Sequence, residues 1–113
     1  PPAASVWSAR QEGDVVTFEQ AGRPLLRYQG GAGQLPRPDI PPVFQRGGYV
    51  SFLATPSGRL VTDDYPDNHK HHHGLWSTFC KVLFDDRRPD FWNMGDRKGT
   101  VLATGHESPW VAG

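Results

Sequence analysis

Glycine and proline are spread along the whole chain, and their distribution limits the length of any regular element. The 113 residues include 13 Gly and 11 Pro, about a fifth of the total. Proline interrupts helices and sheet interiors, and glycine marks turns. The densest stretch is residues 29–42, where half of the positions are Gly or Pro. We predict an exposed loop there, and short elements joined by turns elsewhere.

Short segments rich in β-branched and aromatic residues lie between these turns. Residues 15–19 and 25–28 flank a turn and predict a β-hairpin. Further strands are predicted at residues 49–54, 59–62, 75–84 and 100–104, with 75–84 the strongest. No segment repeats apolar residues at helical spacing over three turns, so no helix longer than about two turns is expected. The fold class predicted is all-β, an antiparallel β-sandwich.

The length of the chain allows one small domain with one core. Residues 1–113 are therefore expected to be a single β-rich domain or the N-terminal part of one. The chain starts at Pro1 without Met and ends at Gly113 as a new element begins, so we expect a fragment of a larger sandwich. Its partner would then be the remainder of its own domain, or a second copy that covers the open sheet edge.

Charge and hydropathy exclude two classes of partner. Twelve basic and twelve acidic residues give a formal net charge of zero, which argues against a nucleic-acid-binding face. No run of about 18 apolar residues is present, so no membrane-spanning helix is expected. The one cysteine, Cys80, cannot form an internal disulfide, and its place in a predicted strand favours a packed thiol over a catalytic one.

Histidines are concentrated in one stretch, where His69, His71, His72 and His73 fall within five positions. Imidazole titrates near neutral pH and is the commonest neutral metal ligand. In an extended backbone, alternate side chains share a face, so His72 would point away from the other three. Acidic residues just upstream are candidates to orient one of these rings: Asp63, Asp64 and Asp67.

Three interpretations of this stretch remain open. Imidazoles on one strand face, completed by a carboxylate, could hold a divalent transition metal such as Zn, Fe, Mn or Cu, with His69, His71 and His72 as its ligands. The same three rings could instead act as general acid or base. They could also form a polar turn that packs against Trp76 and Trp92.

A second candidate segment pairs large rings with polar groups at Asp90, Phe91, Trp92 and Asn93. Sugar sites combine aromatic faces with a few placed carboxylate or amide groups. We therefore consider Asp90, Trp92 and Asn93 as substrate-binding residues, and Phe91 as part of the core. The alternative is an aromatic core strand with polar neighbours. Arg59 is a further candidate, for an anionic substrate group, although a solvated strand residue fits the same position.

The basic run Arg87-Arg88 is offset by acidic neighbours at Asp85, Asp86 and Asp90. This balance favours a solvated turn over a nucleic-acid patch. The chain contains no phosphate-binding Gly-rich loop, nucleophile elbow, His-Glu-x-x-His motif or Cys-x-x-Cys pair. Several common enzyme classes are thereby excluded.

Three motifs in this order resemble the bacterial PmoA-like family, often labelled methane oxygenase PmoA. They are Pro-Ser-Gly-Arg-Leu-Val-Thr at 56–62, Pro-Asp-Asn-His-Lys-His-His-His-Gly-Leu-Trp at 66–76, and Asp-Phe-Trp-Asn-Met-Gly at 90–95. In the resemblance, His69, His71 and His72 match recurring histidines, His73 falls on a variable position, and Asn68 replaces the usual Asp. It implies a longer β-sandwich protein, exported to the periplasm or beyond by polysaccharide-degrading bacteria. The methane oxygenase activity is not carried over, because that enzyme is embedded in the membrane.

These patterns together predict a carbohydrate-active protein whose partner is a glycan or another small molecule. In the leading interpretation it is an enzyme acting on a sugar or glycoside. Its catalytic centre would be His69, His71 and His72, used as acid/base groups or as metal ligands. The alternative is a non-catalytic module in which the histidines shape a surface that binds carbohydrate or another ligand, or serve a structural role.

Overall fold

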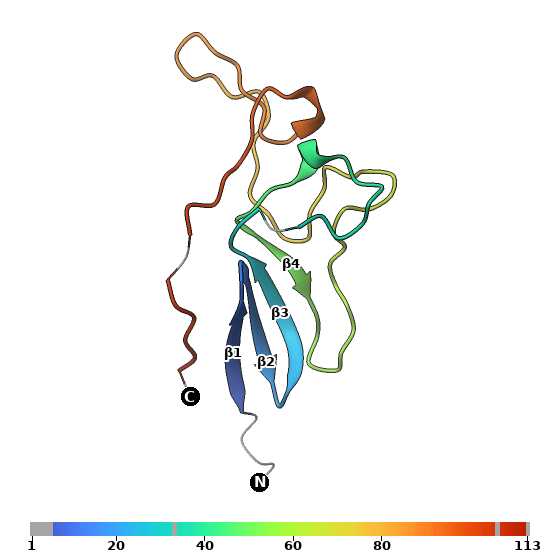
Figure 1. The fold of residues 1–113 in the computed structure, drawn as a ribbon, viewed down its shortest axis with the longest axis vertical. Helices are drawn as coiled ribbons and strands as arrows, with labels where there is room; N and C mark the ends of the chain where they lie inside the picture. The colour runs from blue at the N-terminus through green and yellow to red at the C-terminus, as the bar shows by residue number, and fades with distance from the viewer. Residues whose placement is uncertain (1–5, 33, 106, 113) are drawn as a thin grey trace.

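The computed structural model describes residues 6–32, 34–105 and 107–112. The described residues do not include the two chain ends on which the fragment hypothesis rests. They also do not include Gly33 of the predicted loop or the fifth histidine, His106. One four-stranded antiparallel sheet in the order β1-β2-β3-β4 fills the lower half of Figure 1, and irregular segments fill the upper half. The strands are β1 Trp7–Glu12, β2 Val15–Gln20, β3 Arg23–Gln29 and β4 Tyr49–Leu53.

Tight turns join the first three strands into a meander. Gly13 takes a φ of 58°, and Ala21 and Gly22 take φ values of 50° and 75°, as two-residue hairpin turns require. Val16 on β2 and Leu25 on β3 are buried. The predicted hairpin between residues 15–19 and 25–28 is confirmed.

A long irregular connection links β3 to β4, whose register places Leu26 opposite Leu53. Its only regular element among the described residues is the short 3₁₀ helix η1, Pro42–Phe44. A second 3₁₀ helix, η2, spans Met94–Asp96, and no helix in the described part of the chain is long and apolar enough to cross a membrane. The all-β fold class is confirmed. The described residues contain one sheet, so the second layer of a sandwich stays a prediction.

The strand predicted at residues 75–84 is wrong. Leu75 pairs through a single bridge to Val50, Phe84 pairs only with Arg87 across a tight turn, and the residues between them form no bridge. Lys81 takes a φ of 54°, which interrupts an extended backbone. A strand needs a partner along its length, and none is present here among the described residues. Cys80, expected to be packed, is exposed for the same reason.

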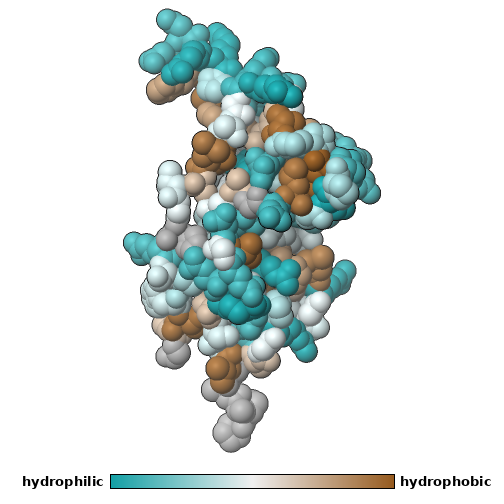
Figure 2. Space-filling view, in the orientation of Figure 1, coloured by the Kyte–Doolittle hydropathy of each residue, from teal (hydrophilic) through white to brown (hydrophobic). Residues whose placement is uncertain are grey.

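Two other predicted strands are also absent. Residues 59–62 pair with β4 and the residues after it through one bridge, between Ala54 and Leu60. Two backbone hydrogen bonds flank this bridge, from Thr55 N to Arg59 O (2.9 Å) and from Val61 N to Leu53 O (2.8 Å), and no continuous strand forms. Residues 100–104 run without a strand partner. Several apolar side chains of these segments therefore remain exposed: Leu60, Val61, Leu75, Phe79, Leu83, Phe84 and Leu102. Figure 2 shows hydrophobic residues interspersed with hydrophilic ones on the surface.

Candidate functional site

The histidine-rich segment is folded into consecutive turns. His69 N donates to Pro66 O (2.9 Å), and His72 N donates to His69 O (2.8 Å). Tyr65 N donates to His72 O (3.1 Å), which closes the loop at its base. The predicted alternation of histidine side chains is therefore wrong, because it assumed an extended backbone.

This folding brings three imidazoles together, which we call the histidine cluster: His69, His71 and His72. The ring centroids of His69 and His72 lie 4.8 Å apart in a stacked arrangement. His71 lies 4.4 Å from His72, edge-on, and 5.8 Å from His69. His69 is exposed, and the other two are half-buried. The three candidate catalytic histidines are thus neighbours, and His73 is separated from them.

Two tryptophans extend the cluster into a larger surface. The Trp92 ring meets His72 edge-on at 5.7 Å, and Trp76 lies 6.0 Å from His72. The two indoles lie 5.4 Å apart, and Trp92 keeps 38% of its surface exposed. We call the histidine cluster with Trp76 and Trp92 the ring platform.

Burial keeps part of the histidine cluster uncharged. The pKa values of His71 and His72 are lowered, first by partial removal from water and then by the positive charges of neighbouring imidazoles. The negative charge of Asp90 partly opposes this shift by raising the pKa of His71. At neutral pH both rings are therefore in the neutral form, which can accept a proton or a hydrogen bond.

The geometry does not support the metal-centre interpretation. Within the described ranges, no group of three His, Cys, Asp or Glu side chains is placed to hold a metal ion. A metal bound by three imidazoles needs their nitrogens to converge on one point at about 2.0–2.1 Å. Here His69 and His72 stack with an interplanar angle of 26°, so they present ring faces to each other.

Asp90 organises its own turn. Its Oδ1 accepts hydrogen bonds from the backbone N–H groups of Trp92 and Asn93, both at 2.9 Å, and its Oδ2 accepts one from Asn93 Nδ2 at 2.8 Å. These bonds lower the pKa of Asp90. Asp90 and Asn93 were predicted to bind substrate; the structure shows them bonded to each other, holding Trp92 in place.

Arg59 is separate from the ring platform. Its backbone N donates to Thr55 Oγ1 (3.0 Å) in an exposed turn. Figure 1 shows this turn at the lower end of the molecule, beside the sheet, whereas the histidine-rich segment lies in the upper half. Arg59 is thus not brought together with the other candidate site residues.

A buried polar network beneath the platform was not predicted. His73 Nδ1 donates to Asp64 Oδ1 (3.0 Å), and Tyr49 Oη donates to Asp64 Oδ2 (3.1 Å). The His73 ring lies between Tyr49 and Tyr65, with centroid distances of 4.5 and 4.7 Å, and 5.1 Å from Trp76. His73 thereby forms part of the core that supports the platform.

Arg46 completes this network and is almost fully buried, with 1% of its surface exposed. Its guanidinium lies over the Trp76 ring, 5.0 Å from the centroid. Nη2 makes a long hydrogen bond to Ser77 O (3.4 Å), and Nε and Nη1 have no partner. Desolvation lowers the pKa of Arg46 and raises those of Tyr49 and Tyr65.

The network joins residues from distant parts of the chain, and only one sequence signal pointed to it. Asp64 had been considered as a group that orients a histidine, and it does orient His73, outside the cluster proposed for catalysis. No spacing rule connects Arg46 or Tyr49 with residues 64–76, so the sequence could not identify them.

A family model described as a family of unknown function, DUF6807, matches residues 15–109. The chain belongs to the DUF6807 family. The match covers strands β2 to β4, the histidine-rich segment and the Asp90 turn, and it leaves out β1. The candidate site of this DUF6807 chain therefore lies within the family region. No curated protein and no solved structure matches it significantly. Nothing in the match links DUF6807 to PmoA, and the PmoA-like resemblance stays an expectation.

Proposed function

We propose that this DUF6807 chain is a carbohydrate-active protein that acts on a sugar or glycoside at the ring platform. The observation that carries the proposal is the position of Trp92. Its exposed indole lies beside the half-buried, neutral imidazole of His72, so one surface combines an apolar ring face with a proton acceptor.

Trp92 is the group that would bind the sugar. The C–H face of a sugar packs on an aromatic ring, whose face carries partial negative charge. Asp90 accepts hydrogen bonds from the backbone N–H groups of Trp92 and Asn93 and so fixes the backbone that carries the indole. The indole is therefore held in place before a ligand arrives, which reduces the ordering cost of binding.

His71 is the group we assign to proton transfer. The neutral imidazole would take a proton from a sugar hydroxyl or from water. The negative charge of Asp90, which raises the pKa of His71, would stabilise the resulting imidazolium. His72 lies 4.4 Å from His71, ring to ring, and is the second candidate for the same step.

A non-catalytic binding module is the second candidate, and one observation favours it. No described side chain forms a hydrogen bond with the rings of His69, His71 or His72. Catalytic histidines are usually oriented by such a partner. In this alternative, Trp92 and the imidazoles bind sugar without changing it, and export would place the module near polysaccharide, as the resemblance implies.

Binding and product formation are measured together to separate the two candidates. Oligosaccharides are titrated by calorimetry and incubated with the protein, and reducing ends are quantified. We expect Trp92→Ala to weaken binding at least about tenfold, and His71→Ala and His72→Ala to lower turnover while binding persists. Trp7→Ala is the matched control, because Trp7 is an exposed indole on β1. Saturable binding without product supports the module, and binding that survives Trp92→Ala overturns both candidates.

A further inference from the structure

A second hollow opens next to the Asp90 turn, which we call the basic pocket. Its volume is about 450 Å³, and it is lined by Phe84, Arg87, Arg88, Pro89, Phe91 and Lys98. Three cationic side chains and two phenyl rings thus surround one space. No acidic residue is part of this lining.

The acidic neighbours that balance the charge in the sequence do not line this pocket. Phe84 and Arg87 exchange two backbone hydrogen bonds of 3.0 Å, which places Asp85 and Asp86 at the exposed tip of a tight hairpin. Within the described ranges, no carboxylate forms an ion pair with a cation of the pocket. The solvated turn expected at Arg87-Arg88 is confirmed, because both side chains are exposed and follow the turn at residues 85–86. The same two side chains also line the pocket.

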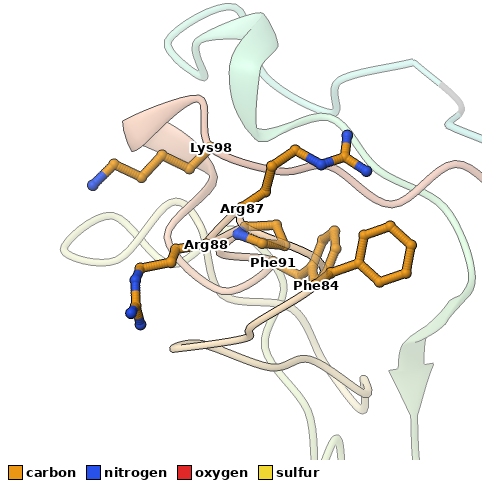
Figure 3. Close-up of a pocket in the computed structure, with 6 residues that line it drawn as sticks. Phe84, Arg87, Arg88, Phe91 and Lys98 are labelled. Carbon is orange, nitrogen blue, oxygen red and sulfur yellow. The ribbon is translucent and has the colours of Figure 1, made fainter.

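The three cationic side chains of the pocket differ in the contacts that they make. The Arg87 guanidinium lies over the Phe84 ring, 5.2 Å from its centroid. Figure 3 shows Arg88 and Lys98 extending to the left of the view, away from the Phe84 ring and from Arg87. Arg88 and Lys98 are exposed and make no hydrogen bond to any described residue. These two cations are therefore available to an anionic group of a ligand.

The basic pocket and the ring platform share one short backbone segment. Phe91 lines the pocket, and its backbone N donates to Phe79 O (2.9 Å). The next residue, Trp92, contacts His72 on the platform. The positive charge of Lys98 also acts on Asp90, which orders this segment. The basic pocket and the ring platform are therefore joined through residues 90–92.

We propose that the basic pocket binds an acidic sugar of the glycan held at the ring platform, with its carboxylate or sulfate group between Arg88 and Lys98. Arginine and lysine bind both anions through charge-assisted hydrogen bonds, and Phe84 and Phe91 provide the apolar surface that a sugar ring needs. The net charge of zero argues for recognition of one local anionic group, since a polyanion-binding face would need a broad positive field. This inference rests on the proposed function and narrows its substrate class.

The test compares oligosaccharides that carry a carboxylate, a sulfate or no charged group. Calorimetry on the full chain uses an oligogalacturonate for the carboxylate, a sulfated carrageenan oligosaccharide for the sulfate, and a neutral oligosaccharide of equal length. We expect one of the anionic probes to bind more tightly than the neutral one, and Arg88→Gln/Lys98→Gln to weaken that binding roughly tenfold. Which probe gains affinity identifies the anion.

Two control variants separate charge, folding and site. Arg23→Gln/Arg27→Gln removes the same formal charge from two exposed positions on β3 and is expected to leave binding unchanged. Arg88→Lys/Lys98→Arg keeps both charges and is expected to retain most of the affinity. Equal binding of neutral and anionic probes, lost in Trp92→Ala, overturns the acidic-sugar inference alone. Absence of binding to every probe overturns the proposed function, and equal losses in both glutamine double variants overturn the assignment of the pocket.

Discussion

The Nδ1 atom of His73 lies 3.0 Å from Oδ1 of Asp64, and this contact separates His73 from the three histidines before it. Asp64 accepts from Nδ1, so the neutral ring presents a lone pair at Nε2, which is buried and has no partner. His73 is 4% exposed, whereas the histidine cluster reaches the surface. One short stretch, residues 69–73, thus supplies both a buried structural histidine and a surface cluster.

Protonation of His73 is expected to unfold the protein as the pH falls. Burial lowers the pKa of His73 from its ordinary value of 6.5, with a further contribution from the charge of Arg46, while Asp64 opposes the shift. A lowered pKa means that the unfolded chain binds the proton more tightly. The stability contribution is therefore fully present above pH 6.5 and is lost as the pH falls below that value. Urea unfolding between pH 7.5 and 5 should show this decline.

Replacing His73 isolates its share of this pH dependence. In His73→Gln, the free energy of unfolding should fall less steeply with decreasing pH, by at most about 1.4 kcal/mol per pH unit for one proton. The same slope is measured for the comparison variant His71→Gln/His72→Gln. The pKa values of His71 and His72 are also lowered, but their rings are only half-buried. An unchanged slope in His73→Gln would contradict the role assigned to His73.

Arg46→Met should leave the free energy of unfolding unchanged to within about 1 kcal/mol, or raise it. The guanidinium is buried, forms one long hydrogen bond and leaves Nε and Nη1 without a partner. An unsatisfied buried group costs about 1–3 kcal/mol, and methionine keeps an unbranched chain of similar length against Trp76. Urea unfolding measures the difference, with Arg46→Lys as the variant that keeps the charge. A loss of about 3–5 kcal/mol in Arg46→Met would reveal a buried ion pair.

Local patterns in the sequence predicted the β2–β3 hairpin correctly because both the turn and the pairing are local. Ala21 and Gly22 form a two-residue turn, and the strands that it joins are adjacent in the chain. The segment 75–84 has equally strong strand composition, but composition does not provide a partner. In that segment Leu75 pairs with Val50 and Phe84 with Arg87, each through one isolated bridge. The residues between them are irregular.

The sequence predicted the parts of the candidate site that depend on residue type, and it did not predict the parts that depend on contacts. The histidine cluster and Trp92 were identified because residue type alone indicates their chemistry. Their arrangement was not, because the turn that joins His69 N to Pro66 O folds the rings together and cancels strand alternation. The network around Arg46 depends on contacts between distant segments, for which the sequence has no local signal.

Gly74→Ala is expected to detach the histidine-rich segment from the sheet. A Cβ at Gly74 would overlap the carbonyl oxygen of Val50. Val50 and Leu75 exchange two backbone hydrogen bonds of 2.9 Å at this point, so the added methyl group must displace them. We expect the free energy of unfolding to fall by about 1–3 kcal/mol. Leu75→Ala, at an exposed side chain, should change it little, and equal effects of the two variants would argue against this close contact.

Asp90 and Trp92 should behave as one unit when oligosaccharide binding is measured by calorimetry. Asp90 holds the backbone of Trp92 through hydrogen bonds. If this is its only role, Asp90→Ala weakens binding only because the indole is no longer held in position. Each single variant should then lower affinity roughly tenfold, and the double variant should lose little more than Trp92→Ala alone. Asp90→Asn keeps an oxygen that accepts from the same N–H groups and should lose less than Asp90→Ala. Additive losses in the double variant would instead mean that the Asp90 carboxylate contacts the sugar itself.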